Sequence, residues 1–218
     1  MNTNNINVII VSGGMVCKNL VLDIVQSTDN PYLIGVDRGA EILDEYGVEA
    51  DLVIGDFDSA KASVKIKYEN KPNAIFLNPI KDATDTHMAV LEAIKLNPDS
   101  VTILGATGGR LDHMMGNFAL LKLLVDEGIS ASIIDQHNKI TMIDKQMKID
   151  KDKQYGKYVS LIPFTDEVTG ITLAGFLYGL SDATMIKADT LGISNEIREE
   201  EGHITIKSGY LMVMETKD

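Results

Sequence analysis

The chain has 218 residues, 44% of them hydrophobic, and a formal net charge of −12 at pH 7. This length can bury a sizeable core, in one large domain or two small ones, and the negative charge argues against binding to a nucleic-acid backbone. The single cysteine, Cys17, cannot form an internal disulfide, which fits a reducing compartment. The N-terminus is polar, and no apolar run approaches the roughly 20 residues of a bilayer span. We therefore expect a soluble cytoplasmic protein without a signal peptide or membrane contact.

Short apolar runs alternate with amphipathic stretches over the first 136 residues. The apolar runs are rich in β-branched residues and predict strands at residues 7–11, 32–36, 52–54, 74–77, 100–104 and 130–134. The amphipathic stretches predict helices around residues 18–26, 42–43, 64–68, 88–94 and 118–125. This alternation is typical of a doubly wound, mostly parallel sheet. Ligands of such sheets bind outside the carboxyl ends of the strands.

After residue 136 the pattern changes to short strand-like runs separated by Gly, Asp and Ser turns. These runs cover residues 139–143, 158–163, 168–173, 176–180, 203–207 and 210–215. No segment has a convincing helical period, so this part predicts a small all-β sandwich or barrel. We expect an α/β domain over residues 1–136 and an all-β domain over residues 137–218.

The first polar cluster, residues 55–59 (GDFDS), directly follows the predicted strand 52–54. Gly55 lets the chain leave extended geometry, so that Asp56 and Asp58 can turn toward one point. Two carboxylates beside the hydroxyl of Ser59 suit Mg²⁺, which completes its shell with water and substrate phosphate. The alternative is that Asp58 or Ser59 only caps the helix that follows.

The second polar cluster, residues 81–86, opens the fourth predicted helix and carries Asp82 and Asp85. Its alternative role is again an N-cap, in which Thr84 or Asp85 accepts hydrogen bonds from free amides. Because this cluster also follows an apolar run, the two clusters together favour a site at one edge of the sheet.

The third polar cluster, residues 105–113 (GATGGRLDH), follows the strand predicted at 100–104. Its glycines let the backbone approach a phosphate, the helix N-terminus favours anions, and Arg110 can neutralise phosphate oxygens. Asp112 has the alternative role of a helix cap, and His113 that of a surface residue. The histidines have no zinc-ligand spacing. The residues alone therefore predict a two-domain Mg²⁺-dependent enzyme that acts on a phosphorylated ligand, with the acceptor unidentified.

Residues 55–59, 81–85 (KDATD) and 105–113 resemble, in this order and spacing, the catalytic motifs of the thiamine pyrophosphokinase family. The later stretches 160–163 (SLIP), 175–180 (GFLYGL) and 191–196 (LGISNE) resemble motifs of its C-terminal domain, so the resemblance covers nearly the whole chain. The family transfers a diphosphate from ATP to the hydroxyethyl group of thiamine and releases AMP. The resemblance implies an α/β catalytic domain, a β-sandwich that binds thiamine, Mg²⁺ as cofactor, and a homodimer with thiamine near the subunit interface.

Residue by residue, the resemblance implies three sets of site residues. The metal ligands are Asp56, Asp58 and Asp85, and the catalytic residues also include Asp82, Arg110 and Asp112. The nucleotide-binding residues are Asp37, Gly39, Ser59, Lys81, Thr84, Gly105, Gly108, Gly109 and Arg110. Asp112 would lie beside the reacting hydroxyl, as a proton acceptor or an orienter, and Ser194 and Asn195 would contact thiamine.

Two features depart from the family pattern. Its common Asp-Gly-Gly-Ala stretch is DRGA here, with Arg38 in place of a glycine. The chain has no tryptophan, so stacking on the pyrimidine of thiamine would need Tyr178, Phe176 or an aromatic residue of a partner subunit.

Two other function classes compete with this assignment. A phosphatase with an aspartyl nucleophile also carries Asp-x-Asp after a strand, but the chain lacks an adjacent Asp-Asp pair later in its α/β part. A non-catalytic nucleotide sensor would not need three polar clusters on neighbouring strand ends.

Overall fold

The structure is a computed structural model that describes residues 6–56, 67–69, 71–78 and 82–218. It divides into two compact units, Met1–Gln136 and His137–Asp218, which are described separately. Three predicted site residues, Asp58, Ser59 and Lys81, lie outside the described residues, as does most of the helix expected around residues 64–68.

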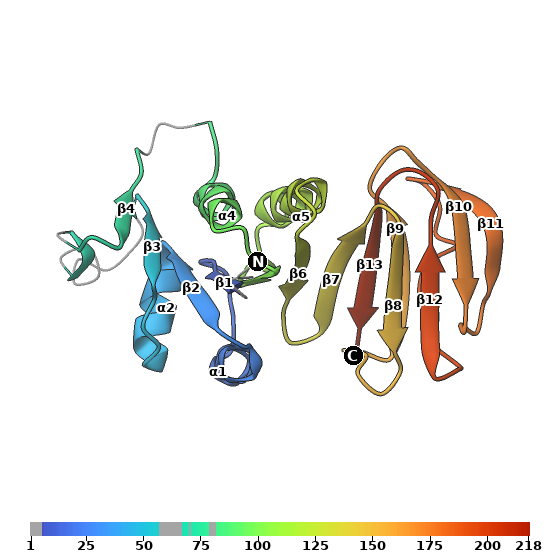
Figure 1. Cartoon of the computed structure of the whole chain (residues 1–218), viewed down its shortest axis with the longest axis horizontal. Helices are drawn as coiled ribbons and strands as arrows, with labels where there is room; N and C mark the ends of the chain where they lie inside the picture. Colours follow the sequence, from blue (N-terminus) through green and yellow to red (C-terminus); the bar gives the residue numbers. More distant parts are fainter. Residues whose placement is uncertain (1–5, 57–66, 70, 79–81) are drawn as a thin grey trace, which may run out of the picture. The chain divides into compact units, whose positions relative to one another are not determined.

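The described part of the first unit contains a six-stranded parallel sheet (Figure 1). In chain order its strands are β1 (Asn7–Val11), β2 (Pro31–Val36), β3 (Leu52–Gly55), β4 (Ala74–Phe76), β5 (Ser100–Leu104) and β6 (Ser130–Ile134). They lie in the order β4-β3-β2-β1-β5-β6. The chain thus moves outward from β1 on one side and then crosses to the other, so the strand order reverses between β1 and β5. Ligands of doubly wound sheets bind at such a switch point.

Helices cover both faces of this sheet. On one face lie α1 (Lys18–Ser27) and α2 (Arg38–Tyr46), and on the other lie α4 (Asp85–Lys95) and α5 (Leu111–Asp126). The predicted doubly wound architecture is therefore confirmed. α2 ends at Gly47, whose φ of 76° is the left-handed conformation that glycine adopts cheaply. In the described part of the chain, no helix is long and apolar enough to span a bilayer.

The second unit, whose residues are all described, is a sandwich of two antiparallel sheets. One sheet contains β7 (Asn138–Ile143), β13 (Leu211–Thr216) and β9 (Tyr158–Pro163). The other contains β11 (Leu180–Ile186), β10 (Glu167–Ala174), β12 (Glu201–Thr205) and β8 (Gln146–Asp150), in that order. Side chains of both sheets form one core, and its fully buried members include Val159 and Val213 of one sheet and Ile171 and Ile204 of the other. The predicted all-β sandwich is confirmed.

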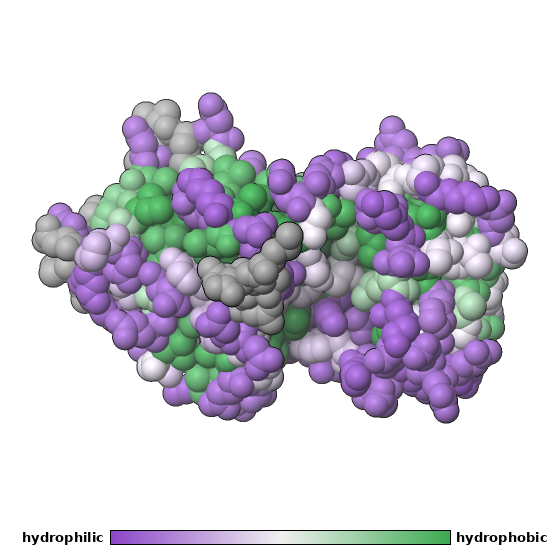
Figure 2. Space-filling model, viewed as in Figure 1, coloured by the Kyte–Doolittle hydropathy of each residue, from purple (hydrophilic) through white to green (hydrophobic). Residues whose placement is uncertain are grey.

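The strand assignments were wrong at the edges of this second sheet. Residues 176–179 of the predicted run 176–180 lie outside the strands: Phe176 forms only an isolated bridge with Ile197, and Leu180 begins β11. The edge strands β8 and β11 were missed, because exposed polar residues make up much of both and each has only one buried side chain, Ile149 in β8 and Met185 in β11. On β8, Lys148 lies 2.9 Å from the carboxylates of both Asp150 and Glu201. Figure 2 shows hydrophilic side chains over much of this unit, and charges on an edge strand oppose pairing with another chain.

Candidate functional site

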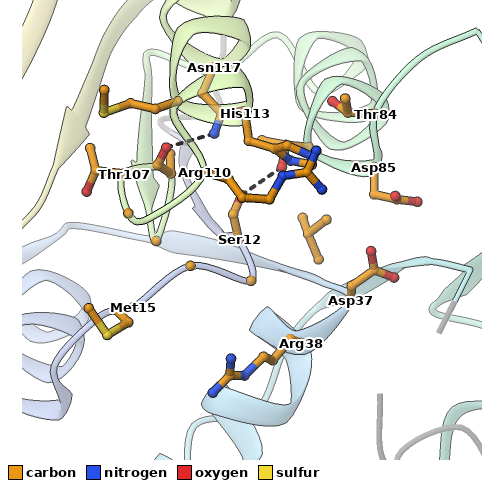
Figure 3. A pocket seen from close by; sticks show the side chains of 18 of the residues that line it. Ser12, Met15, Asp37, Arg38, Thr84, Asp85, Thr107, Arg110, His113 and Asn117 are labelled. Atoms are coloured by element: carbon orange, nitrogen blue, oxygen red, sulfur yellow. Dashed lines mark hydrogen bonds between the residues drawn. The ribbon is translucent and has the colours of Figure 1, made fainter. Parts of the chain in front are cut away.

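A cavity of about 560 Å³ opens in the first unit at the carboxyl ends of β1, β2 and β5 (Figure 3). Its lining comprises residues 12–15 after β1, 36–38 after β2, 84–86 at the start of α4, 105–110 after β5, and His113, Met114 and Asn117 of α5. The cavity therefore lies at the switch point of the sheet. Its volume falls in the range of small-molecule and cofactor sites.

The loops after β1 and β5 interlock at this point. The amide of Ser12 donates to the carbonyl of Leu104 over 2.8 Å, and the amide of Gly14 donates to the carbonyl of Gly105 over 2.9 Å. A Cβ on Gly14 would overlap the Gly105 carbonyl oxygen, and Gly105 itself has a φ of 66°. Glycine is required at both positions because two backbones pass closely there.

The second half of the glycine-rich loop is open. A Cβ built on Gly108 or Gly109 would meet no atom within 4 Å. The backbone of these two residues is therefore accessible to a ligand, and it leads directly into the N-terminus of α5. Backbone amides at a helix N-terminus bind phosphate groups well.

Carboxylates enter the cavity from two further elements. Asp37 ends β2 with a φ of 49°, a conformation that is strained for a residue other than glycine and that is common at ligand sites. Its amide donates to the carbonyl of Ile54 over 2.9 Å, which joins the ends of β2 and β3. Figure 3 shows the carboxylates of Asp37 and Asp85 on the same side of the cavity. Asp85 is the first residue of α4, and the cap is Thr84, whose side chain accepts from the His87 amide.

The described residues test the expected metal site only in part. No three His, Cys, Asp or Glu side chains among residues 6–56, 67–69, 71–78 and 82–218 are grouped so that they could hold a metal ion. The expected set, however, includes Asp58, which lies outside these residues. The described members, Asp56 at the end of β3 and Asp85, supply only carboxylate oxygens, which is the donor type that Mg²⁺ prefers.

Arg110 and Asp112 form an ion pair at the start of α5. Arg110 Nη2 lies 2.6 Å from Asp112 Oδ2, and Nε lies 3.2 Å from Oδ1, with both side chains mostly exposed. The hydrogen bond from Arg110, followed by one from the His113 amide, lowers the pKa of Asp112 to about 2. Asp112 is therefore ionised and a poor proton acceptor near neutral pH. Its alternative role as the helix cap is wrong, because the N-cap position belongs to Arg110.

The structure brings some of the expected nucleotide-binding residues together and separates others. The cavity is lined by Asp37, Thr84, Asp85, Gly105, Gly108, Gly109 and Arg110. Four other expected residues of this unit, Gly39, Asp56, Asp82 and Asp112, do not line it. Gly39 is buried in α2, where a Cβ would overlap the carbonyl oxygen of Val11.

Several lining residues were not predicted from the sequence. They are Ser12, Gly13, Gly14, Met15, Arg38, Thr86, Thr107, His113, Met114 and Asn117. The cluster 12–14 follows a strand-like run as the other clusters do, so the same criterion would have found it. Thr86 of α4 lies beside this cluster, because its hydroxyl oxygen is 3.0 Å from that of Ser12. Asn117 had no such signal, since it lies inside a helix.

The two residues expected to contact thiamine lie in one turn of the second unit. Ser194 is exposed, has a φ of 58°, and donates its amide to the Ser160 hydroxyl over 3.0 Å. Asn195 is 5% exposed. Its Oδ1 accepts from the amides of Tyr178 at 3.0 Å and Glu196 at 2.9 Å, and its Nδ2 donates to the Tyr178 carbonyl over 2.8 Å. The Asn195 side chain therefore holds the 176–178 segment against its own turn.

Large apolar side chains are exposed on these two joined segments. Leu177 is 41% exposed, Tyr178 65%, Leu191 65% and Ile193 46%. The Leu177 amide donates to the Glu196 carbonyl over 2.8 Å, so the segments that carry these side chains are hydrogen-bonded to each other. Exposed apolar side chains that lie together are typical of surfaces that bind a ligand or another protein.

Two sequence families match the chain, one for each unit. "Thiamin pyrophosphokinase, catalytic domain" matches residues 26–133, and "Thiamin pyrophosphokinase, vitamin B1 binding domain" matches residues 145–211. Thiamine pyrophosphokinase of Bacillus subtilis is 36% identical over 212 residues, which cover 96% of this chain and 98% of that protein.

Solved structures agree with the sequence relatives. The crystal structure of the Bacillus subtilis thiamine pyrophosphokinase superposes with a TM-score of 0.87 at 34% identity, covering 97% of this chain and 99% of that one. The Geobacillus thermodenitrificans thiamin pyrophosphokinase gives a TM-score of 0.84 at 31% identity, covering 97% and 98%. The yeast enzyme, at 15% identity and a TM-score of 0.81, shares the fold. With both units matched by family and by structure over nearly the whole length, the chain belongs to the thiamine pyrophosphokinase family.

Proposed function

We infer that this protein is a thiamine pyrophosphokinase, which transfers the diphosphate of ATP to the hydroxyl of thiamine and releases AMP. The observation that carries this inference is the cavity at the switch point, most of whose lining lies within the matched catalytic domain of the family. Its glycine-rich loop, two helix N-termini and Arg110 suit a polyphosphate, and its carboxylates suit the cation that accompanies one.

Transfer of a phosphoryl group needs little covalent help from a protein, so the chain's residues act by positioning and by charge. The open backbone at Gly108 and Gly109 would bind phosphate oxygens, with the N-terminus of α5 behind it. Arg110 would leave the Asp112 carboxylate and bind the oxygens of the transferring phosphates. Its planar guanidinium group can form paired hydrogen bonds with either partner. The thiamine hydroxyl would then attack the β-phosphorus in line, the bond from that phosphorus to the oxygen bridging to the α-phosphate would break, and AMP would leave with this oxygen on the opposite side. The proton of the hydroxyl would pass to solvent.

The lowered pKa of Asp112 belongs to the free protein, in which Arg110 is bound to this carboxylate. A carboxylate whose pKa is about 2 stays ionised at neutral pH and takes up a proton weakly. Once Arg110 has moved to the phosphates, the Asp112 carboxylate can accept the hydrogen bond of the thiamine hydroxyl, and we assign it to orienting that hydroxyl.

We also propose that Mg²⁺ serves as cofactor, held by Asp56, Asp58 and Asp85. When bound, the ion would neutralise charge on the polyphosphate. Support comes from the oxygen-only donors at the ends of β3 and at the start of α4. Asp37, which lines the cavity beside Asp85, is a further carboxylate that can orient water around such an ion.

The second unit is proposed to take thiamine at the turn of Ser194 and Asn195. The hydroxyl of Ser194 is exposed and can contact a polar heterocycle, while Asn195 shapes the turn through its own hydrogen bonds. The exposed Leu177 and Tyr178 offer apolar and aromatic contacts for the rings. We further propose that the protein is a cytoplasmic homodimer in which this surface lies near the subunit interface.

Product analysis with ATP, Mg²⁺ and thiamine tests the proposed function. AMP should accumulate one for one with thiamine diphosphate. ADP as the main nucleotide product would mean transfer of a single phosphate and would contradict the assignment. Phosphate release without thiamine would indicate a phosphatase, and nucleotide binding without any turnover would indicate a sensor.

A further inference from the structure

Asn117 is a buried polar residue in a helix whose other buried residues, beginning with Phe118 and Leu120, are apolar. It is 9% exposed and lines the cavity. Its Nδ2 donates to the carbonyl of Ala106 over 2.8 Å, in the glycine-rich loop eleven residues earlier in the chain. A buried amide is retained where its hydrogen bonds are satisfied, and this one is satisfied by the loop.

The residues beside Ala106 in the loop are held as well. The Gly105 carbonyl accepts from the Gly14 amide at 2.9 Å, and the Thr107 hydroxyl donates to Oδ2 of Asp135, just after β6, over 2.8 Å. Three consecutive loop residues are thus attached to three separate elements: the segment after β1, helix α5 and the end of β6.

The attachments stop where the ligand-accessible part of the loop begins. Side-chain hydrogen bonds fix Ala106 and Thr107, while the backbone of Gly108 and Gly109 faces open space. Glycine is the most conformationally permissive residue, so a loop ending in two glycines would populate many conformations without such anchors. Ordering it on ligand binding would then weaken the affinity for that ligand.

We propose that Asn117 and Asp135 are positioning residues for the nucleotide. They hold two consecutive residues in the first half of the glycine-rich loop, so that the amides of its second half are already arranged for the phosphates. Both act through the loop and neither is placed at the reacting atoms. This rests on the proposed function, because it takes the phosphates of ATP as the ligand of the loop.

Asn73 offers a matched control. Its Nδ2 also donates to an alanine carbonyl, that of Ala50, over 3.2 Å, but it does not line the cavity. Asn117→Ala and Asn73→Ala therefore remove the same kind of hydrogen bond, one at the loop and one away from it. A purely structural hydrogen bond would affect thermal stability in both variants and nucleotide affinity in neither.

The experiment measures the affinity of the full chain for α,β-methylene-ATP by calorimetry, together with the melting temperature and the KM for thiamine. Asn117→Ala should weaken analogue binding about tenfold, the loss expected for one hydrogen bond, with the KM for thiamine unchanged. Asn73→Ala should leave analogue binding within about twofold of wild type. If both variants lower only the melting temperature, the proposal is overturned.

Asp135 supplies a second, independent pair of variants, which decides the matter if Asn117→Ala does not fold. Asp135→Asn and Asp135→Ala remove the same charge, but only Asn keeps an oxygen that accepts from Thr107. Analogue binding should therefore be several-fold weaker in Asp135→Ala than in Asp135→Asn, whereas equal affinities would overturn the proposal.

The wild-type protein separates this proposal from the proposed function. Analogue binding that depends on Asn117 or Asp135, without formation of AMP and thiamine diphosphate, would contradict the proposed function and support the positioning role of these two residues. Absence of any analogue binding by the wild type would overturn both.

Discussion

The cavity of the first unit and the Ser194–Asn195 turn of the second unit use polar residues in opposite ways. At the cavity, the lining is made of glycine backbone and of charged residues, among them Asp37, Asp85 and Arg110. At the turn, the Asn195 amide is buried and engaged by its own chain. The large exposed side chains beside it are apolar instead, Leu177 and Tyr178 among them.

This difference matches the two proposed ligands. A polyphosphate is highly charged and is bound by oriented amides and cations. Thiamine presents two flat rings, for which apolar and aromatic contacts contribute more. Polar residues in turns are therefore proposed to bind a ligand in the first unit, while in the second unit Asn195 holds neighbouring segments of its own chain.

The largest effect is expected from removing charge at the cavity. Asp85→Asn keeps the shape of the side chain, and Thr84 still caps α4. Turnover should fall on the order of 100- to 1000-fold, the typical loss for one electrostatic contact at a transition state. Melting curves should show little change, since Asp85 is not the cap. Preserved turnover with a lower melting temperature would show that Asp85 stabilises the fold, as Asn195 does, and does not serve the ligand of the cavity.

The second-largest effect is expected from a change in the backbone that lines the cavity. Gly105→Ala puts a Cβ on a residue with a φ of 66° and within 2.5 Å of the Ser12 carbonyl oxygen. The free energy of unfolding should fall by about 1–3 kcal/mol, and analogue binding should weaken with it. Gly116→Ala in α5 is the control, because a Cβ there meets nothing within 4 Å; it should stabilise the helix by about 0.5–1 kcal/mol. Denaturant titration of both variants measures these changes.

The turn of the second unit should respond differently. Asn195→Ala leaves the Tyr178 and Glu196 amides without their acceptor, which costs about 1–3 kcal/mol of unfolding free energy. Because the 176–178 segment loses its attachment, the KM for thiamine should rise while the affinity for α,β-methylene-ATP stays at the wild-type value. Weakening of both ligands alike would argue that the two sites are not separable.

A smaller effect is expected at the Arg110–Asp112 pair. Asp112→Asn weakens the hold of this side chain on Arg110, and an exposed ion pair of this kind contributes little because solvent screens it. Calorimetry should therefore show analogue binding strengthened by up to about fivefold, while turnover falls because the thiamine hydroxyl loses its acceptor. Weaker analogue binding would show that Asp112 supports the phosphate site rather than competing for Arg110.

The smallest effect concerns pH. Since Arg110 lowers the pKa of Asp112 to about 2, the ion pair is present above the ordinary value of 3.8 and is lost only as pH falls through about 2. The pH profile of kcat/KM between about pH 5 and about pH 9 should therefore show no ionisation of Asp112, and Asp112→Asn should keep the same profile shape. An ionisation near neutral pH that disappears in the variant would restore Asp112 as the proton acceptor.

The sequence by itself determined the alternation of strands and helices in the first unit and the all-β character of the second. It also indicated that Asp37, Asp85, the glycines of residues 105–109 and Arg110 lie at strand ends. Each of these features depends on the spacing of neighbouring residues, which the chain displays directly. The missed edge strands β8 and β11 give a weaker signal, because each has only one buried side chain, Ile149 in β8 and Met185 in β11.

Only the tertiary structure decided which loops meet. Residues 12–14 and Gly105 are about ninety positions apart, and they interlock because the strand order places β1 beside β5. The Asn117 contact with Ala106 and the burial of Asn195 arise in the same way, from elements packed against each other after folding. A polar residue's partner is set by the topology of the sheet, and local sequence carries no record of that topology.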